Sequence, residues 1–307
     1  MARISGVDIP DDKRPEYALR YIFGIGPTRA KDIVAKSQVD GTKRMRELSE
    51  VDITRLREVI DREYTVEGDL RVIRTNSLPD HETGAFPNDG NPHTISENDA
   101  VYSVPVSPEF AAASTSVLGS DNRPSYKFGV AVNGIVFDPT TAEFWKRDAS
   151  TGWNIEAIGT LDLGLDDNEA HVQPDGTYHY HGVPHGLIAS EDGTRHSALY
   201  GYAADGFPTY ILYGYSDAND SSSAPKSMAS SFQLITSGKR PQPDSGPGGD
   251  WDGTYTQDYE YIAGSGDLDE CDGRLGVTPE HPDGTYLYFI TSSFPFQPRC
   301  LKGTPDI

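Results

Sequence analysis

The 307-residue chain has no long hydrophobic run. No stretch approaches the roughly 18 consecutive apolar residues that a membrane-spanning helix requires, so the sequence predicts no such helix. An export signal would need a shorter apolar run near the N-terminus, and Asp8, Asp11 and Asp12 interrupt that region. We therefore expect a cytoplasmic protein.

Three common enzyme signatures are also missing. The sequence has no Gly-x-Ser-x-Gly nucleophile elbow, no Walker phosphate loop and no zinc-protease helix. These absences leave the corresponding hydrolase classes without support in the sequence. A catalytic function would have to rest on other residues.

Basic residues are scarce, with 26 Lys and Arg against 47 Asp and Glu. This charge argues against nucleic acid as a partner, because Lys and Arg hold the phosphate backbone. The charge is unevenly distributed along the chain, because residues 1–74 contain 15 of the basic and 14 of the acidic residues, a net charge of +1. Residues 75–307 carry a net charge of −22 and all eight histidines. We therefore predict two domains, 1–74 and 75–307, each long enough to form its own core.

Residues 1–74 have the periodicity of helices. Ser49 and Asp52 form a capping-box pattern, and the apolar residues Ile53, Leu56 and Ile60 follow at helical spacing. The pattern predicts an amphipathic helix of about three turns.

Two more helices are expected upstream, over residues 17–23 and from Pro27 to Lys36. The glycines of the Gly24-Ile25-Gly26 turn between them leave backbone N–H groups at a helix start, which suits a phosphate. Taken alone, however, this motif favours a simple turn between two helices.

Three collinear blocks, residues 2–10, 21–30 and 66–71, resemble the N-terminal half of the small-subunit ribosomal protein S13 family. The resemblance implies an RNA-binding module of helix-two-turns-helix type whose partners are small-subunit rRNA and ribosomal proteins. By the same resemblance, the candidates for rRNA contact are Arg3, Lys13, Arg14, Gly24, Gly26, Thr28, Arg29 and Lys31. The family's basic C-terminal tail has no counterpart after Arg74, so we expect weak RNA binding.

Residues 75–307 have the signature of a β-rich domain. Short runs of Val, Ile, Tyr, Phe and Thr alternate with Gly, Pro, Asn and Asp. The predicted strands are residues 100–105, 127–137, 177–181, 199–202, 255–262 and 285–290. The expected fold class is thus α+β multidomain, a small all-α module followed by a larger, mostly β domain.

An Asp-Gly turn leading into a strand occurs three times, in residues 174–181, 252–255 and 282–289. In the third copy, Leu287 and Phe289 stand where the first has His179 and His181. Since leucine and phenylalanine are ordinary core residues, the frame itself does not require histidine.

Four histidines, His171, His179, His181 and His185, fall within 15 residues. Alternate residues of a strand share one face, so His179 and His181 are expected to point the same way. Two imidazoles on one face form half of a metal site, and His171 and His185 are the candidates to complete it. The alternative is a pair of hydrogen-bonded histidines at a sheet edge. The nearby acidic residues are candidate acceptors for the ring N–H groups, although solvation of a loop explains them better; they are Asp162, Asp166, Asp167 and Glu169.

The Tyr178-His179-Tyr180-His181 motif and several flanking segments resemble the YHYH family over residues 75–306. No defined activity comes with that family, and many of its members resemble exported proteins. An exported type of domain would favour a disulfide between Cys271 and Cys300, whereas a reducing cytosol would keep both as thiols.

Two weaker candidates lie in the same part of the chain. The acidic run from Asp267 to Gly273 resembles half of a calcium loop, but its spacing is broken and no closing glutamate follows. Asp205, in an Asp-Gly turn, is a candidate acid, although turn formation explains it better. The sequence thus favours a transition metal, zinc or copper, over calcium.

Our interpretation is a fusion of a truncated rRNA-binding module with a YHYH domain that binds a transition metal through clustered histidines. The alternative is a metal-dependent hydrolase or oxidoreductase of exported type, with a non-functional or misjoined N-terminal module. Because the sequence offers no persuasive catalytic base, we rank the enzyme below the binding protein.

Overall fold

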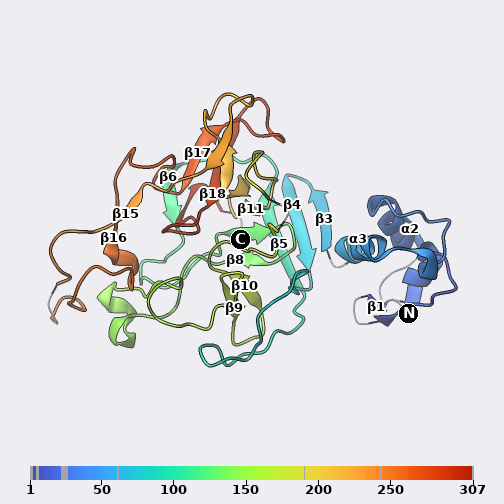
Figure 1. Cartoon of the computed structure of the whole chain (residues 1–307), viewed down its shortest axis with the longest axis horizontal. Helices are drawn as coiled ribbons and strands as arrows, with labels where there is room; N and C mark the ends of the chain where they lie inside the picture. The colour runs from blue at the N-terminus through green and yellow to red at the C-terminus, as the bar shows by residue number, and fades with distance from the viewer. Residues whose placement is uncertain are drawn as a thin grey trace.

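A computed structural model describes residues 3–4, 7–21, 27–60, 62–189, 191–241 and 244–305. The chain is mostly β, with few helices (Figure 1). None of the helices in these ranges is both long and apolar enough to cross a membrane.

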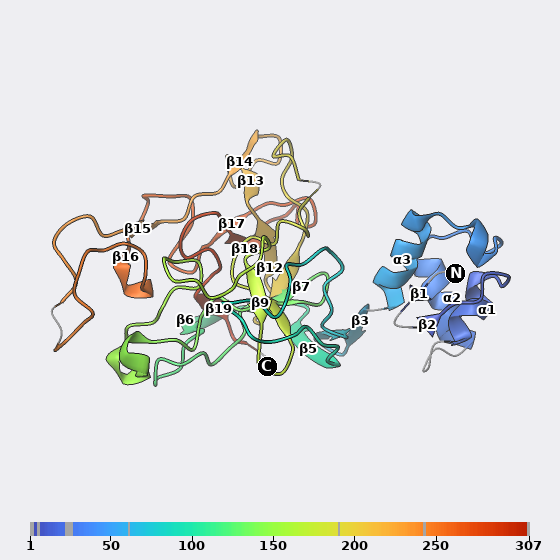
Figure 2. The same ribbon diagram turned by 60° about the horizontal axis from the view of Figure 1, so that its bottom comes forward.

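The α-helices α1, α2 and α3 gather at the N-terminal end of the chain, on the right of Figure 2. The elements there are β1 (Arg3–Ile4), β2 (Val7–Asp8), α1 (Pro15–Ala18), η1 (Leu19–Tyr21), α2 (Pro27–Lys36), η2 (Met45–Glu47) and α3 (Glu50–Ile60). Their apolar side chains form a separate core, in which Leu19, Ala30 and Leu56 are fully buried.

Two of the predicted helices have the expected bounds. The helix α2 begins at Pro27, a residue suited to the first turn because it has no N–H to leave unpaired, and ends at Lys36. The capping box at α3 is confirmed: Asp52 N donates to Ser49 Oγ at 3.2 Å, and Ser49 N donates to Asp52 Oδ2 at 3.1 Å. The Gly24–Gly26 turn lies outside the described residues.

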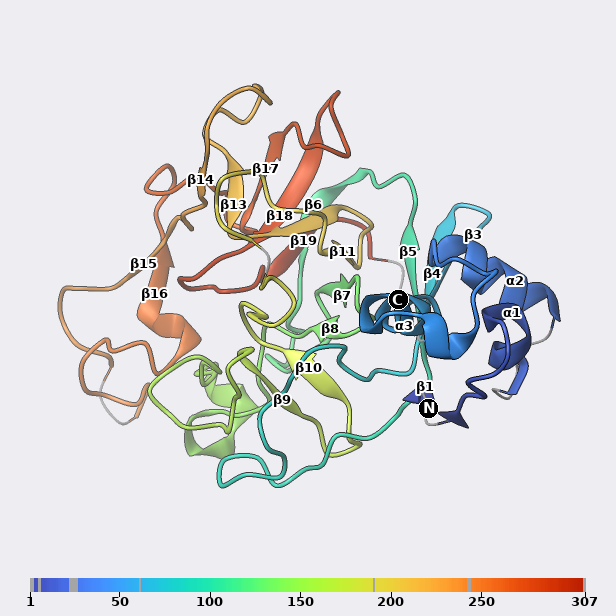
Figure 3. The ribbon, with the colours of Figure 1, turned by 45° about the vertical axis from the view of Figure 1, so that its right-hand side comes forward.

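A three-stranded antiparallel sheet follows, formed by β3 (Arg62–Glu67), β4 (Leu70–Thr75) and β5 (Ala100–Pro105) in the order β3-β4-β5. All six residues of β4 pair with β3 on one side and with β5 on the other. In Figure 3, β4 lies between these two neighbours. Because β3 and most of β4 lie within residues 1–74, the expectation of an all-α N-terminal module is wrong. The sheet also crosses the expected boundary at residues 74 and 75, and the division into two domains stays a prediction.

The centre of the molecule is an eight-stranded mixed sheet with the order β17-β18-β12-β11-β7-β8-β10-β9. Its strands are β7 (Gly129–Ala131), β8 (Val136–Phe137), β9 (Ala170–Val172), β10 (Tyr178–Tyr180), β11 (Gly201–Ala203), β12 (Pro208–Ile211), β17 (Gly273–Gly276) and β18 (Thr285–Ile290).

This sheet consists of two copies of one four-stranded arrangement. In the first unit, the hairpin β7–β8 is followed by the antiparallel pair β9–β10, and β10 lies parallel to β8. In the second unit, β11–β12 is followed by β17–β18, and β18 lies parallel to β12. The two units meet where β7 and β11 pair antiparallel about Val130 and Tyr202. The sheet therefore has an approximate internal twofold symmetry.

The registers make the positions of the two units equivalent. Tyr178 opposite Val172 corresponds to Tyr286 opposite Leu275. Both units also have a glycine with positive φ before the inner strand, Gly176 and Gly284, with φ of 90° and 91°. The similar sequences of residues 174–181 and 282–289 are thus one part of a structural repeat that covers the whole sheet.

The core between and around these strands is rich in aromatic residues. Fully buried Phe128, Tyr180 and Tyr288 belong to it, together with Ile135 and Phe137. The Tyr288 ring packs edge-on against Phe128 with centroids 5.0 Å apart. The two units therefore share one hydrophobic cluster.

Predicted strands agree with the structure to different extents. The bounds of β5 and β18 match, and β10 is one residue shorter at each end than predicted. The single strand expected over residues 127–137 is wrong, since it is a hairpin that turns at Asn133-Gly134, where Gly134 has a φ of 77°. Only Tyr259–Tyr261 of residues 255–262 is a strand, named β16, because residues 256–258 form the short helix η5.

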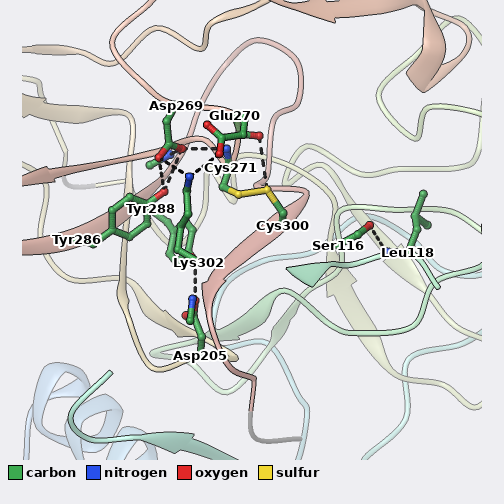
Figure 4. The surroundings of a disulfide bond; sticks show 12 residues. Ser116, Leu118, Asp205, Asp269, Glu270, Cys271, Tyr286, Tyr288, Cys300 and Lys302 are labelled. Atoms are coloured by element: carbon green, nitrogen blue, oxygen red, sulfur yellow. Dashed lines mark hydrogen bonds and ion pairs between the residues drawn. A yellow bond between two sulfur atoms is a disulfide. The ribbon is translucent and has the colours of Figure 1, made fainter. Parts of the chain in front are cut away.

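The remaining elements flank the central sheet. They are β6 (Phe110–Ser116) paired with β19 (Cys300–Gly303), β13 (Tyr213–Tyr215) with β14 (Pro225–Ser227), β15 (Phe232–Leu234) with β16, and the short helices η3 (Trp145–Arg147), η4 (Ala149–Thr151) and η5 (Thr256–Asp258). Cys271 and Cys300 form a disulfide that ties the start of β19 to the loop before β17 (Figure 4).

Candidate metal centre

Three histidines meet on one face of β9 and β10. His179 lies within β10, and His181 follows two residues later, so both side chains leave the same face of the sheet. His171, on β9, is the direct antiparallel partner of His179. The strand alternation inferred from the sequence places the first two, and the β9–β10 register supplies the third.

The Nε2 atoms of this triad converge. His179 Nε2 lies 3.0 Å from His181 Nε2, which lies 3.1 Å from His171 Nε2. Each histidine offers one nitrogen to a group whose atoms all lie within 4.8 Å of one another. Three nitrogens bound to one zinc ion at about 2.1 Å would be about 3.4 Å apart in a tetrahedral arrangement. The triad is therefore nearly of the size that a metal ion requires.

The other ring nitrogens, the Nδ1 atoms, face the backbone in two of the three residues. His171 Nδ1 lies 2.9 Å from Leu163 O, and His179 Nδ1 lies 3.3 Å from Thr177 O. A carbonyl oxygen only accepts hydrogen bonds, so these contacts place the proton on Nδ1 and leave Nε2 with a lone pair. The nearby acidic side chains, which the sequence offered as candidate acceptors, do not fill this role for His171 and His179. Asp166 accepts from Tyr178 Oη, and Glu169 accepts from Val183 N.

Burial keeps the triad uncharged. His179 is fully buried and His181 is 2% exposed. Burial lowers the pKa of His179 and of His181 well below the usual value, with the neighbouring imidazoles as a further cause, and burial also lowers the pKa of His171. Neutral imidazole is the form that binds a metal ion.

A cavity of about 840 Å³ opens beside the triad. All three histidines line it, and so do Asp138 and Gln173. Gln173 Nε2 lies 3.4 Å from His179 Nε2. Neither Asp138 nor Gln173 stood out in the sequence as a site residue, although Gln173 lies two residues after His171 and so shares its strand face.

His185 does not join the triad, contrary to the set of four proposed from the sequence. The chain turns after β10 through Gly182, Val183 and Pro184, and the His185 side chain is exposed. Of the histidines and acidic residues in the described ranges, only His171, His179 and His181 form a group of ligands close enough for one ion.

The two tyrosines of the motif have a different function from the histidines. Tyr178 and Tyr180 are fully buried in the hydrophobic core. Tyr178 Oη donates to Asp166 at 2.7 Å, and Tyr180 Oη lies 2.6 Å from His81 Nε2. Burial raises the pKa of Tyr178, so that its hydroxyl stays protonated. The tyrosines therefore anchor the strand, while the histidines face the cavity.

The candidates for rRNA contact are placed only in part. Arg14 and Lys31 are exposed, and the Lys13 ammonium lies 5.8 Å from the centre of the Tyr21 ring. Arg3 lies on β1, and Thr28 and Arg29 lie on α2, but their side chains are outside the described part of the chain, as are Gly24 and Gly26 entirely.

Asp205 and the acidic run from Asp267 have structural contacts. Asp205 Oδ2 accepts hydrogen bonds from Tyr288 Oη at 2.6 Å and from Gly303 N at 2.8 Å. Asp269 Oδ1 accepts from Cys271 N at 2.9 Å and from Tyr286 Oη at 3.0 Å, beside the disulfide in Figure 4. These carboxylates hold turns and strands together.

Comparison with known proteins identifies both parts of the chain. Residues 101–303 match the family model described as YHYH protein, and the chain belongs to this family. Residues 3–87 match a second model, described as Ribosomal protein S13/S18.

Curated relatives of the N-terminal part are named small ribosomal subunit protein uS13. The protein from Synechococcus sp. is 51% identical over 78 residues, which are 25% of this chain and 62% of that protein. The protein from Dehalococcoides mccartyi is 54% identical over 71 residues, which are 23% of this chain and 55% of that protein. The chain thus spans about three fifths of the length of these relatives.

Proposed function

We propose that the YHYH part of the chain binds one transition-metal ion through the Nε2 atoms of His171, His179 and His181. The observation that supports this most strongly is the convergence of three neutral, largely buried imidazole nitrogens at 3.0 and 3.1 Å. Because the protons of His171 and His179 are on Nδ1, only His181 can provide an N–H among the three Nε2 atoms.

The triad cannot satisfy its own hydrogen bonds. If the proton of His181 is on Nε2, it can serve one of the two neighbouring lone pairs, and the other needs a donor from outside the triad, which for His179 is the Gln173 amide at 3.4 Å. If it is on Nδ1, the three Nε2 lone pairs face one another and none of the three histidines has an N–H to place between them. A buried lone pair left without a partner costs about 1–3 kcal/mol. A cation at the centre would accept all three lone pairs, which favours a bound ion.

The second unit of the sheet indicates that the histidines are not needed for folding. At the positions equivalent to His179 and His181 it has Leu287 and Phe289, and opposite Leu287 it has Arg274, the counterpart of His171. Leu287 and Phe289 are buried in an apolar cluster. The same strand arrangement thus carries apolar core residues in one unit and imidazoles in the other, which supports a function for the imidazoles.

Nitrogen donors without a carboxylate favour zinc or copper over calcium, which prefers oxygen ligands. The test is elemental analysis of protein purified without a chelator or a histidine tag. We expect about one equivalent of metal, lost in the double variant His179→Leu/His181→Phe, which copies the second unit. The matched control is His185→Ala, which removes a nearby exposed histidine and should keep the metal. Metal-free wild-type protein that takes up no zinc or copper on addition would overturn the proposal.

We propose a second function for the N-terminal part, binding to small-subunit rRNA. The supporting observation is its identity of about 51% with small-subunit proteins over 78 residues. The helical arrangement from α1 to α3 is consistent with the expected helix-two-turns-helix module, and Arg14 and Lys31 are exposed there. The affinity should fall steeply with salt, because it rests on phosphate contacts.

Co-sedimentation with purified small subunits in moderate salt tests the rRNA-binding function. The double variant Arg14→Ala/Lys31→Ala should sediment less than wild type. Lys239→Ala, an exposed lysine remote in sequence, serves as the charge-matched control for one of the two changes. Wild-type protein that stays in the supernatant at low salt would contradict the proposal.

A further inference from the structure

Asp138 lines the same cavity as the triad and directly follows β8, the strand that is parallel to β10. In the β8–β10 register, His179 pairs with Val136 and Tyr180 pairs with Phe137. The residues that follow the two strands, Asp138 and His181, continue this pairing, since Asp138 N donates to Tyr180 O at 2.9 Å. Asp138 therefore stands level with His181, on the same face of the sheet.

The carboxylate of Asp138 is buried and only half satisfied. Its side chain is 3% exposed, and Oδ2 forms an ion pair with Lys127. Oδ1 is buried and has no hydrogen-bond partner among the described residues. Buried carboxylate oxygens are normally paired, because leaving one without a donor costs free energy. Since Asp138 lines the cavity beside the triad, a donor in that cavity would complete its hydrogen bonds.

The second unit of the sheet again provides a comparison. The position equivalent to Asp138 is Tyr210, whose hydroxyl donates to Glu280 Oε2 at 2.9 Å and also lies 2.8 Å from Thr278 Oγ1. There the polar group finds partners within the protein. At this position of the sheet, the unit with the three histidines thus has a carboxylate with an unpaired oxygen, whereas the other unit has a paired hydroxyl.

The triad leaves room for a fourth ligand. Asp138 is not part of the converging group, so the ion would have three protein ligands, the number found in metal sites that keep an open position. All three histidines line the cavity, which contains space for more than a water molecule. Gln173, whose amide nitrogen lies 3.4 Å from His179 Nε2, borders the same space.

We propose that the metal ion keeps one coordination position open to this cavity, and that Asp138 Oδ1 accepts a hydrogen bond from the water molecule or other small oxygen- or nitrogen-donor ligand bound there. This inference rests on the proposed metal-binding function. It makes Asp138 a positioning residue that acts on the coordinated ligand without binding the metal. A three-histidine centre of this kind exchanges its fourth ligand, whereas a purely structural site has none to exchange.

Cobalt(II) as the metal and azide as the exchangeable ligand provide the test. The full-length protein is loaded with cobalt, its cobalt content is measured, and its visible absorption spectrum is followed during an azide titration. We expect one equivalent of cobalt and a saturable change of the spectrum. In Asp138→Asn the cobalt content should be unchanged, and azide should bind about tenfold more tightly, because a negative charge next to the anion is removed.

The matched control is Asp175→Asn. Asp175 also lines the cavity, but it is exposed and lies in the Asp-Gly turn before β10. The same loss of charge there should change azide affinity less than twofold, because solvent screens it. An equal effect of both variants would indicate general electrostatics and overturn the assignment of Asp138.

The possible failures are distinguishable. Protein that binds no cobalt, zinc or copper would overturn the proposed metal site and this inference together. Protein with one equivalent of cobalt and no azide response would overturn the open position alone. An azide response that is the same in wild type and Asp138→Asn would leave the open position standing and remove Asp138 from it.

Discussion

Glu169 and Asp272 occupy equivalent positions in the two units of the central sheet. The backbone carbonyl of Glu169 accepts a hydrogen bond from His181 N at 2.7 Å, and that of Asp272 accepts one from Phe289 N at 3.0 Å. Both residues have positive φ, 49° and 55°. Each unit thus places an acidic residue at the same bend, and burial raises the pKa of both side chains.

Asp272 should make the protein less stable as pH rises. Burial raises its pKa from 3.8 to about 8, so between about pH 4 and pH 8 the folded protein holds a proton that the unfolded chain has lost. Stability is then full below the unfolded pKa and falls through this window by roughly 1.4 kcal/mol per pH unit. In Asp272→Asn this contribution disappears, and asparagine tolerates the positive φ. Urea unfolding at pH 5 and pH 7.5 measures the difference.

The control for Asp272 is Asp250→Asn, which removes an acid whose side chain is 75% exposed. Its pH dependence should match that of wild type. If Asp272→Asn also kept the wild-type slope between pH 5 and pH 7.5, Asp272 would not be the buried acid described above.

Metal binding should stabilise the wild-type protein and not the variant His179→Leu/His181→Phe. An ion present at 100 times its Kd adds about 2.7 kcal/mol to the free energy of unfolding. We expect Tm of the wild type to rise on addition of zinc, and Tm of the double variant to stay constant while its unfolding remains cooperative. A variant that fails to fold would contradict the equivalence of the two units, and an equal rise of Tm in both proteins would contradict the site.

Leu56→Ala tests whether the N-terminal part unfolds as a separate domain. Leu56 is fully buried in the core formed by the N-terminal helices. Truncating a buried leucine costs about 2–5 kcal/mol. If residues 1–74 fold on their own, calorimetry should show one transition that moves to lower temperature and one that does not. A single transition that moves as a whole would indicate one cooperative unit.

Arg240→Ala should strongly destabilise the protein. The Arg240 side chain is 6% exposed, and it pairs with Asp258, which is fully buried, and with Asp252. Removing the arginine leaves the Asp258 carboxylate buried without its counter-charge, which costs about 3–5 kcal/mol. Urea unfolding gives the value. Lys239→Ala, which breaks an exposed pair with Asp250, should change stability by less than about 1 kcal/mol.

The sequence predicted features that depend on neighbours along the chain. The capping box at Ser49, the helix from Pro27 and the shared face of His179 and His181 all follow from local spacing. The hairpin at Asn133-Gly134 was missed although its turn dipeptide was present, because the surrounding apolar run suggested one continuous strand. Asp138 could not be predicted as a site residue, since only the parallel pairing of β8 with β10 brings it level with His181, and a register between distant strands leaves no local pattern.

The pairing of β4 with both β3 and β5 has a consequence for dissecting the chain. The match to ribosomal proteins includes β3 and β4, whereas nearly all of β5 lies within the YHYH match. Cutting between them would turn β4 or β5 into an open edge, with a row of unpaired N–H and C=O groups free to recruit another chain. Fragments separated at residue 75 should therefore aggregate more readily than a fragment that begins before β3 and retains the entire three-stranded sheet.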